Sequence, residues 1–162
     1  MALIQKIVLC IITVAIALVL GAGLYSLSME PSIRNDIWIL IPAVLCVLSV
    51  FSFIFHLKTI AFYRDNSEII KSFKSNAVIW YINVAFGVSL IILAFIFAFQ
   101  FSKLYDNNIQ TEFTLLAIIV ITTLLIGVWI CLDFYTLYKK INEVKSTKYI
   151  NQIDDISGQK NQ

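Results

Sequence analysis

The sequence predicts an all-α integral membrane protein, a bundle of four transmembrane helices with both termini in the cytoplasm. Of its 162 residues, 60% are hydrophobic and only 14% are charged, and the mean hydropathy is +0.88. Soluble domains have a charged fraction of about a quarter. Four long runs contain no Asp, Glu, Lys or Arg, and most of the basic residues flank these runs on one side.

Each charge-free run is long enough to cross a membrane. The runs cover residues 7–29, 37–55, 75–102 and 113–132. A helix of about 20 residues spans a hydrocarbon core of roughly 30 Å. The runs are continuously apolar, without the alternation of barrel strands, so their backbone polar groups must be satisfied within helices. We therefore expect a transmembrane domain over residues 1–138, with spans at about 5–28, 37–57, 75–102 and 113–136.

The distribution of basic residues predicts the orientation. The N-terminus, the second connection and the C-terminal tail carry ten of the 12 Lys and Arg residues, whereas the other side has only Arg34 and Lys103. Because basic residues favour the cytoplasmic side, this predicts an N-in/C-in topology. The abundance of Ile, Asn and Lys over Arg indicates a low-GC bacterial source, and we expect the protein to lie in the inner membrane. Contacts to anionic lipid or to a partner are expected from Lys58, Arg64, Lys71, Lys74, Lys139 and Lys140.

The cytoplasmic segments are expected to be partly helical. Asp65 and Glu68 resemble a capping box, so residues 58–74 are predicted to form a short helical hairpin between spans two and three. This hairpin would serve either as a basic collar for anionic lipid or as a docking site for a partner. The tail, residues 139–162, is predicted to extend the last helix and then to become flexible beyond Ser146 and Thr147.

Asp133 is the acidic residue that lies within an apolar segment. Ionisable groups inside membranes are rare and usually face the bundle interior. Asn83 is predicted at a similar depth on the antiparallel third span, so we expect a buried polar pair of Asp133 and Asn83. Alternatively, Asp133 reaches the inner interface, pairs with a lysine there, or belongs to an ion or proton relay. If the pair is structural, Asp133→Asn should largely preserve it, and Asp133→Leu should disturb packing.

Small residues predict a helix contact on the first span. Thr13, Ala17 and Gly21 recur every four residues and form a stripe that lets another helix approach closely. Replacing Ala17 or Gly21 with Leu should therefore force helices apart. The three cysteines lie in three different spans without a C-x-x-C pair, and we interpret them as small apolar core residues: Cys10, Cys46 and Cys131.

Few catalytic or cofactor chemistries fit the sequence. His56 is the single histidine, which excludes a bis-histidine haem within one chain, and we expect it to lie at the membrane interface rather than to bind a metal. The G-x-S-x-G, H-E-x-x-H and P-loop motifs are absent, and an aspartyl enzyme would need a second carboxylate beside Asp133. We therefore expect no enzyme activity, no cofactor, no metal site and no nucleic-acid partner.

Three functions remain. The favoured one is a non-catalytic tetraspan subunit, or an accessory or scaffold protein, of a larger inner-membrane complex, with the bilayer and other membrane subunits or itself as partners. The alternative is a homo-oligomeric ion or proton channel or a small transporter that uses Asp133 and Asn83. A membrane immunity-type protein that binds a pore-forming toxin is the third, because the chain resembles colicin-type immunity proteins in size and in its four-span plan.

Overall fold

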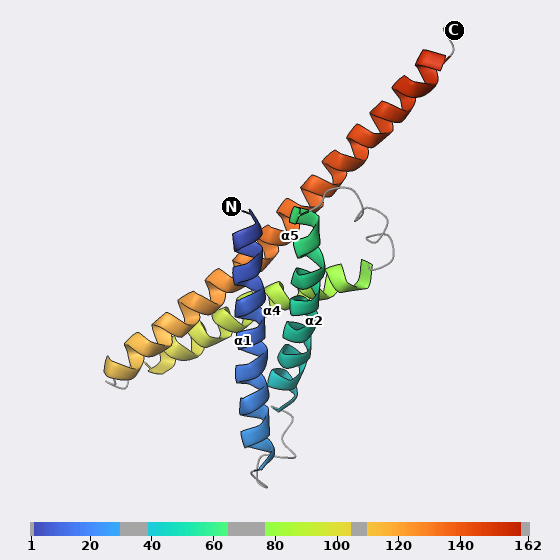
Figure 1. Ribbon diagram of the computed structural model, residues 1–162. Helices are drawn as coiled ribbons and strands as arrows, with labels where there is room; N and C mark the ends of the chain where they lie inside the picture. The colour runs from blue at the N-terminus through green and yellow to red at the C-terminus, as the bar shows by residue number, and fades with distance from the viewer. Residues whose placement is uncertain (1, 30–38, 65–76, 105–109, 160–162) are drawn as a thin grey trace.

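The computed structural model describes residues 2–29, 39–64, 77–104 and 110–159, and these form four long helices (Figure 1). The helices are α1 (Ala2–Ser28), α2 (Leu40–Arg64), α4 (Ala77–Leu104) and α5 (Gln110–Gln159). Each contains a stretch long and apolar enough to span a membrane: Leu3–Ser28, Leu40–Ile60, Val78–Gln100 and Thr114–Glu143. The described residues contain no strand. The predicted all-helical fold with four such helices is confirmed.

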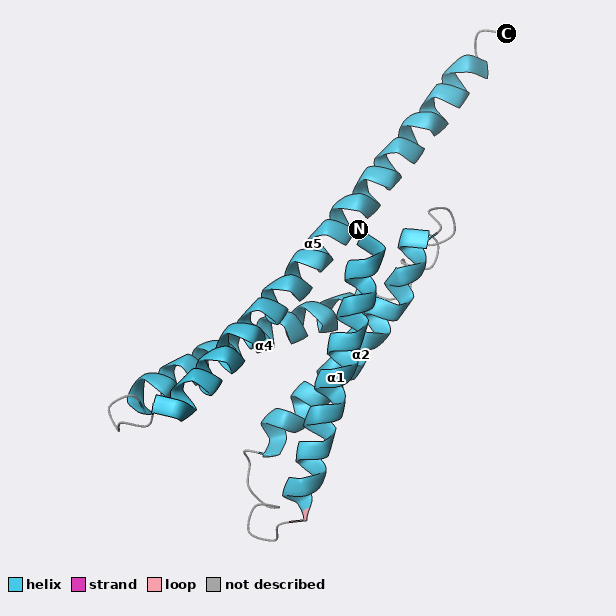
Figure 2. Ribbon diagram, turned by 60° about the vertical axis from the view of Figure 1, so that its left-hand side comes forward, coloured by secondary structure: helices cyan, strands magenta, loops and turns pink. Residues whose placement is uncertain are grey.

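The helices are arranged as two antiparallel hairpins. Helix α1 packs along α2, α4 packs along α5, and α2 also contacts α4. Figures 1 and 2 show that the hairpins meet near the N-terminus of α1 and the C-terminus of α2, and diverge toward their opposite ends. The molecule therefore has a closed half, where all four helices converge, and an open half, where the hairpins separate.

The closed half contains two hydrophobic clusters. The first joins all four helices through Leu9, Phe86, Leu90 and Ile130, with Leu48 of α2 packed against them. The second contains Phe55, Leu137 and Ile141, with Ile79 and Trp80 against them. Along α5 the order is Ile130, Asp133, Leu137, and along α4 it is Trp80, Asn83, Phe86. A layer of polar side chains is therefore enclosed between the two apolar clusters.

The open half buries far fewer side chains than the closed half. No residue is buried in 14–29 and 39–44 of the first hairpin, or in 95–100 and 114–126 of the second. Many large apolar side chains there are exposed, among them Leu18, Phe95 and Ile121. A lipid-facing surface is expected of any transmembrane helix, but here the sides of the hairpins that turn toward each other are also uncovered.

Helix α5 continues far beyond its membrane-spanning stretch. Its 50 residues correspond to a length of ~75 Å at 1.5 Å per residue, and its C-terminal part projects away from the other helices (Figure 1). After Gly127 the helix contains no proline and no glycine until Gly158, so no helix breaker interrupts it before its last two residues. Helix therefore continues beyond Ser146, where the sequence was expected to weaken it. The tip of the predicted hairpin, 65–74, lies outside the described residues.

Candidate functional site

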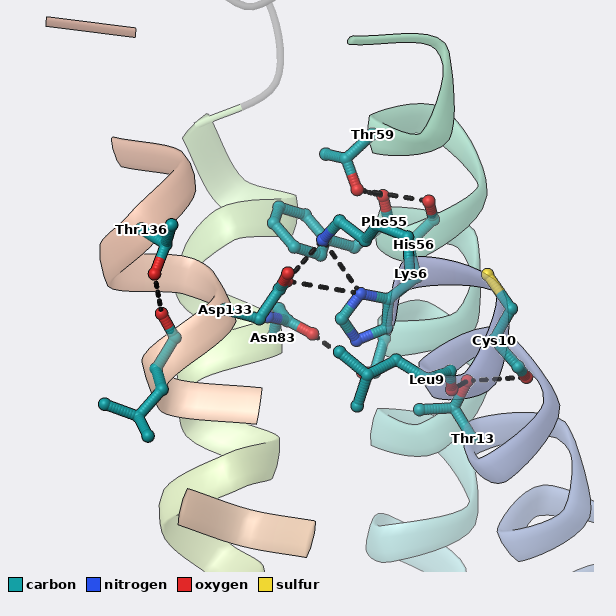
Figure 3. Close-up of polar contacts among 12 residues, drawn as sticks. Lys6, Leu9, Cys10, Thr13, Phe55, His56, Thr59, Asn83, Asp133 and Thr136 are labelled. Atoms are coloured by element: carbon teal, nitrogen blue, oxygen red, sulfur yellow. Dashed lines mark hydrogen bonds and ion pairs between the residues drawn. The ribbon is translucent and has the colours of Figure 1, made fainter. Parts of the chain in front are cut away.

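Three ionisable side chains from three helices meet in the closed half. Lys6 of α1 forms an ion pair with Asp133 of α5. Its Nζ also lies 3.1 Å from Nδ1 of His56 on α2, and this Nδ1 lies 3.6 Å from Oδ2 of Asp133. Figure 3 shows the Lys6 ammonium between the carboxylate and the imidazole ring. The cluster thus links the first hairpin to the second through both α1 and α2.

This cluster is almost completely shielded from solvent. The side chains of Lys6 and His56 are 0% exposed and that of Asp133 is 8% exposed. A charge at this depth is very costly unless it is paired and hydrogen-bonded. Lys6 meets that requirement through Asp133 and through the ring of Phe55, whose centroid lies 5.0 Å from Nζ. Lys6 and Asp133 therefore each depend on the other's charge.

An uncharged pair lies beside the charged cluster. Ser52 of α2 donates a hydrogen bond of 2.7 Å from its Oγ to Oδ1 of Asn83 on α4. Both side chains are fully buried. Ser52 is one helical turn from His56, so the two side chains share a face of α2. His56 Nε2 and Asn83 Nδ2 are buried without a hydrogen-bond partner, which is uncommon for polar atoms in protein interiors.

The buried hydroxyls near this layer bond to their own helices. Thr13 donates to the carbonyl oxygens of Leu9 and Cys10, Ser49 donates to that of Cys46, and Thr59 donates to those of Phe55 and His56. Such bonds satisfy a hydroxyl without connecting two helices. The polar contacts between helices in this layer are therefore those of Lys6, His56, Asp133, Ser52 and Asn83.

The structure corrects the partner predicted for Asp133. Asp133 and Asn83 lie in the same layer, but Asp133 contacts Lys6 and His56, and Asn83 accepts its hydrogen bond from Ser52. A charged partner is favoured because an opposite charge offsets the cost of burying a carboxylate better than an amide does. The alternative of a lysine partner is the one observed, and that lysine belongs to the interior of the bundle.

Lys6 and His56 also differ from their expected environments. Lys6 contributed to the count of cytoplasmic charges, and His56 was expected at the interface, yet both are 0% exposed. Each lies near the end of an apolar helix, where sequence position alone is compatible with either an interfacial or an interior side chain. Their burial follows from the convergence of the four helices at this end.

The small-residue stripe of α1 is a helix contact only in part. Thr13 is buried, and the Sγ of Cys46 on α2 lies 3.7 Å from the carbonyl oxygen of Ala17. At Gly21, however, an added Cβ would have no atom within 4 Å. Within this chain the stripe therefore makes no contact at Gly21, and a contact of Gly21 with a helix outside the chain stays a prediction.

The tightest helix crossing is between α4 and α5. A Cβ at Gly127 would lie 2.8 Å from the carbonyl oxygen of Gly87 and 2.9 Å from Cγ1 of Ile91. A Cβ at Gly87 would lie 2.9 Å from Sγ of Cys131. These distances are below normal carbon contacts, so the crossing requires glycine on both helices. The two glycines are far apart in sequence, and only the antiparallel pairing of the helices brings them together.

The remaining residues singled out from the sequence lie at the surface or in the core. Lys58, Lys139 and Lys140 are exposed in the closed half, and Nζ of Lys139 lies 4.0 Å from Oε1 of Glu143. Arg64 ends α2, whereas Lys71 and Lys74 lie outside the described residues. The cysteines are free thiols, buried for Cys10 and half-buried for the other two, Cys46 and Cys131.

Within the described segments, no group of three or more His, Cys, Asp or Glu side chains is arranged to hold a metal ion. The chemistry that the layer does offer is charge pairing, hydrogen bonding and proton exchange between nitrogen and oxygen atoms. No known protein family, curated protein or solved structure matches the chain.

Proposed function

We propose that the chain is a non-catalytic transmembrane subunit that functions by assembling with other membrane-spanning helices. The observation that carries this proposal is the uneven burial of its two halves. The polar layer and the two apolar clusters hold one half together, whereas no residue in 14–29, 39–44, 95–100 or 114–126 is buried. A bundle that is packed at one end alone offers its other end to a partner.

The surface of the open half suits a transmembrane helix as that partner. Its large exposed side chains are apolar, as at Leu18, Phe95 and Ile118. Gly21 and Gly23 of α1 leave open space where a side chain would stand. Small residues allow a neighbouring backbone to approach closely in membranes, where packing drives helix association. We therefore assign this surface to a helix of another subunit, with a second copy of the chain as the alternative occupant.

Purification in mild detergent tests this assignment. We expect the wild-type protein to migrate as a stoichiometric complex with another membrane protein. Gly21→Leu should release the partner while the chain itself stays folded, because an added Cβ at this position has no atom of the same chain within 4 Å. Ala15→Leu is a matched control, since Ala15 is exposed on a different face of α1. A wild-type protein that purifies as a monomer from native membranes would contradict the proposal.

We further propose that both termini lie in the bacterial cytoplasm and that the helices cross the inner membrane. With Lys6 buried in the polar layer, nine of the 12 basic residues still belong to the closed end and to the segments that adjoin it, against Arg34 and Lys103 on the other side. This imbalance supports the positive-inside orientation. The exposed Lys58, Lys139 and Lys140 are then positioned to contact anionic headgroups.

Reporter fusions in sealed cells check this orientation. A fluorescent reporter that matures only in the cytoplasm is expected to be active when it is fused after Gln162, and an alkaline phosphatase at the same site should be inactive. A fusion after residue 106, between α4 and α5, should give the opposite pattern. An active phosphatase at the C-terminus would reverse the proposed topology.

A further inference from the structure

The Lys6, His56 and Asp133 cluster contains two bases but one carboxylate. Beyond the assembly role, we propose that Lys6 and His56 are alternative carriers of a single proton held opposite Asp133, so that the polar layer is a proton-binding site. The three groups come from α1, α2 and α5. Because the cluster is enclosed, a single carboxylate can balance only one positive charge. Lys6 and His56 therefore cannot both be charged at low cost.

The distances allow the proton to pass directly between the two bases. Nζ of Lys6 lies 3.1 Å from Nδ1 of His56, which is a hydrogen-bond distance. An ammonium has no acceptor, so Lys6 donates, Nδ1 accepts, and the ring proton is on Nε2. On transfer, an N–H bond of Lys6 breaks and an N–H bond forms at Nδ1. Lys6 becomes a neutral amine, His56 becomes an imidazolium, and Asp133 stays ionised.

Both positions of the proton face the same counter-charge. Oδ2 of Asp133 contacts Nζ of Lys6 and lies 3.6 Å from Nδ1 of His56. The net charge of the cluster is unchanged by the transfer. The remaining titratable group near Lys6 is Cys10, one turn along α1, and α4 contributes the uncharged Asn83 among the described residues. Nothing else described in the layer competes for the charge of Asp133.

The transfer changes which helix carries the ionic link between the hairpins. With the proton on Lys6, the link joins α1 to α5, and with the proton on His56 it joins α2 to α5. Neither Nε2 of His56 nor Nδ2 of Asn83 on the adjoining helix has a hydrogen-bond partner among the described residues.

The single histidine makes this proposal directly measurable. The full-length protein with ¹⁵N-labelled histidine, in lipid bilayers at pH 7, gives the signals of His56 alone. We expect a neutral ring with its proton on Nε2 in the wild-type protein. In Lys6→Met the majority of the rings should become imidazolium at the same pH, because His56 is then the base left opposite Asp133. In Lys6→Met combined with Asp133→Asn the ring should be neutral again.

Lys58→Met is the matched control, because Lys58 is exposed and only two residues from His56. It removes one positive charge without touching the cluster and should leave the ring neutral. A neutral ring in a folded Lys6→Met variant would overturn the proposal. If that variant does not fold, the wild-type spectrum decides, since either an imidazolium or a neutral ring protonated on Nδ1 at pH 7 contradicts the assigned hydrogen bond.

Discussion

Asp133→Asn is expected to lower the free energy of unfolding by about 3–5 kcal/mol, the usual cost of removing one partner from a buried ion pair. The substitution keeps the shape of the side chain but leaves the Lys6 ammonium, which is 0% exposed, without a negative charge. Lys6 can limit the lost stability by releasing its proton. For an ordinary lysine at pH 7, that deprotonation itself costs about 4–5 kcal/mol. This result differs from the tolerance that a neutral pair with Asn83 would predict.

Lys6→Met is expected to be milder than Asp133→Asn. Methionine roughly keeps the length and apolar stem of lysine, and Asp133 retains His56 at 3.6 Å as a base that can become positive. The double variant, Lys6→Met with Asp133→Asn, should recover most of the lost stability, because its polar layer contains no unpaired charge. Replacing both members of a buried ion pair often changes stability little. The expected order of stability is therefore the wild type and the double variant, then Lys6→Met, then Asp133→Asn.

Unfolding in mixed micelles measures these differences. Glu143→Gln provides the control, since Glu143 is a carboxylate on the same helix whose side chain is 63% exposed. Exposed ion pairs contribute at most about 1 kcal/mol, so this variant should remain close to the wild type. Equal stability of Asp133→Asn and the wild type would mean that Lys6 is not charged in the folded protein.

The four helices could be predicted from the sequence because their signal is local. A long charge-free run can satisfy its backbone in lipid only as a helix, whatever the other helices do. The length of α5 was less predictable, because Ser146 and Thr147 weaken a helix without breaking it. The divergence of the hairpins could not be predicted, since it depends on contacts between helices that are far apart in sequence.

The polar layer was only partly predictable. Asp133 was identified because it interrupts an apolar segment. Lys6 was missed because it precedes its apolar run, where a lysine normally marks the cytoplasmic interface. A usable signal did exist on α2, where Ser49, Ser52, His56 and Thr59 recur at spacings of three and four and are all buried. A polar stripe of this kind on an apolar helix indicates the side that faces the bundle interior.

The crossing of α4 and α5 gives the second large expected effect. The helices approach so closely at Gly87 and Gly127 that each backbone lies against the other. In Gly127→Ala the new Cβ would stand 2.8 Å from the carbonyl oxygen of Gly87 and 3.1 Å from the backbone nitrogen of Ile91. Backbone atoms cannot move aside as a flexible side chain can, so the helices must separate or shift.

We therefore expect Gly127→Ala to lower the free energy of unfolding by about 1–3 kcal/mol, as overpacking does in other cores. Gly127→Leu should lower the free energy of unfolding more than Gly127→Ala does and prevent α4 and α5 from packing together. Gly21→Ala is the matched control, because its Cβ meets no atom within 4 Å, and alanine in a helix is favoured over glycine by roughly 0.5–1 kcal/mol. It should equal or exceed the wild type when the unfolding of the chain, separated from any partner, is measured in the same mixed micelles. Equal losses at Gly127 and Gly21 would show that α4 and α5 do not cross at their glycines.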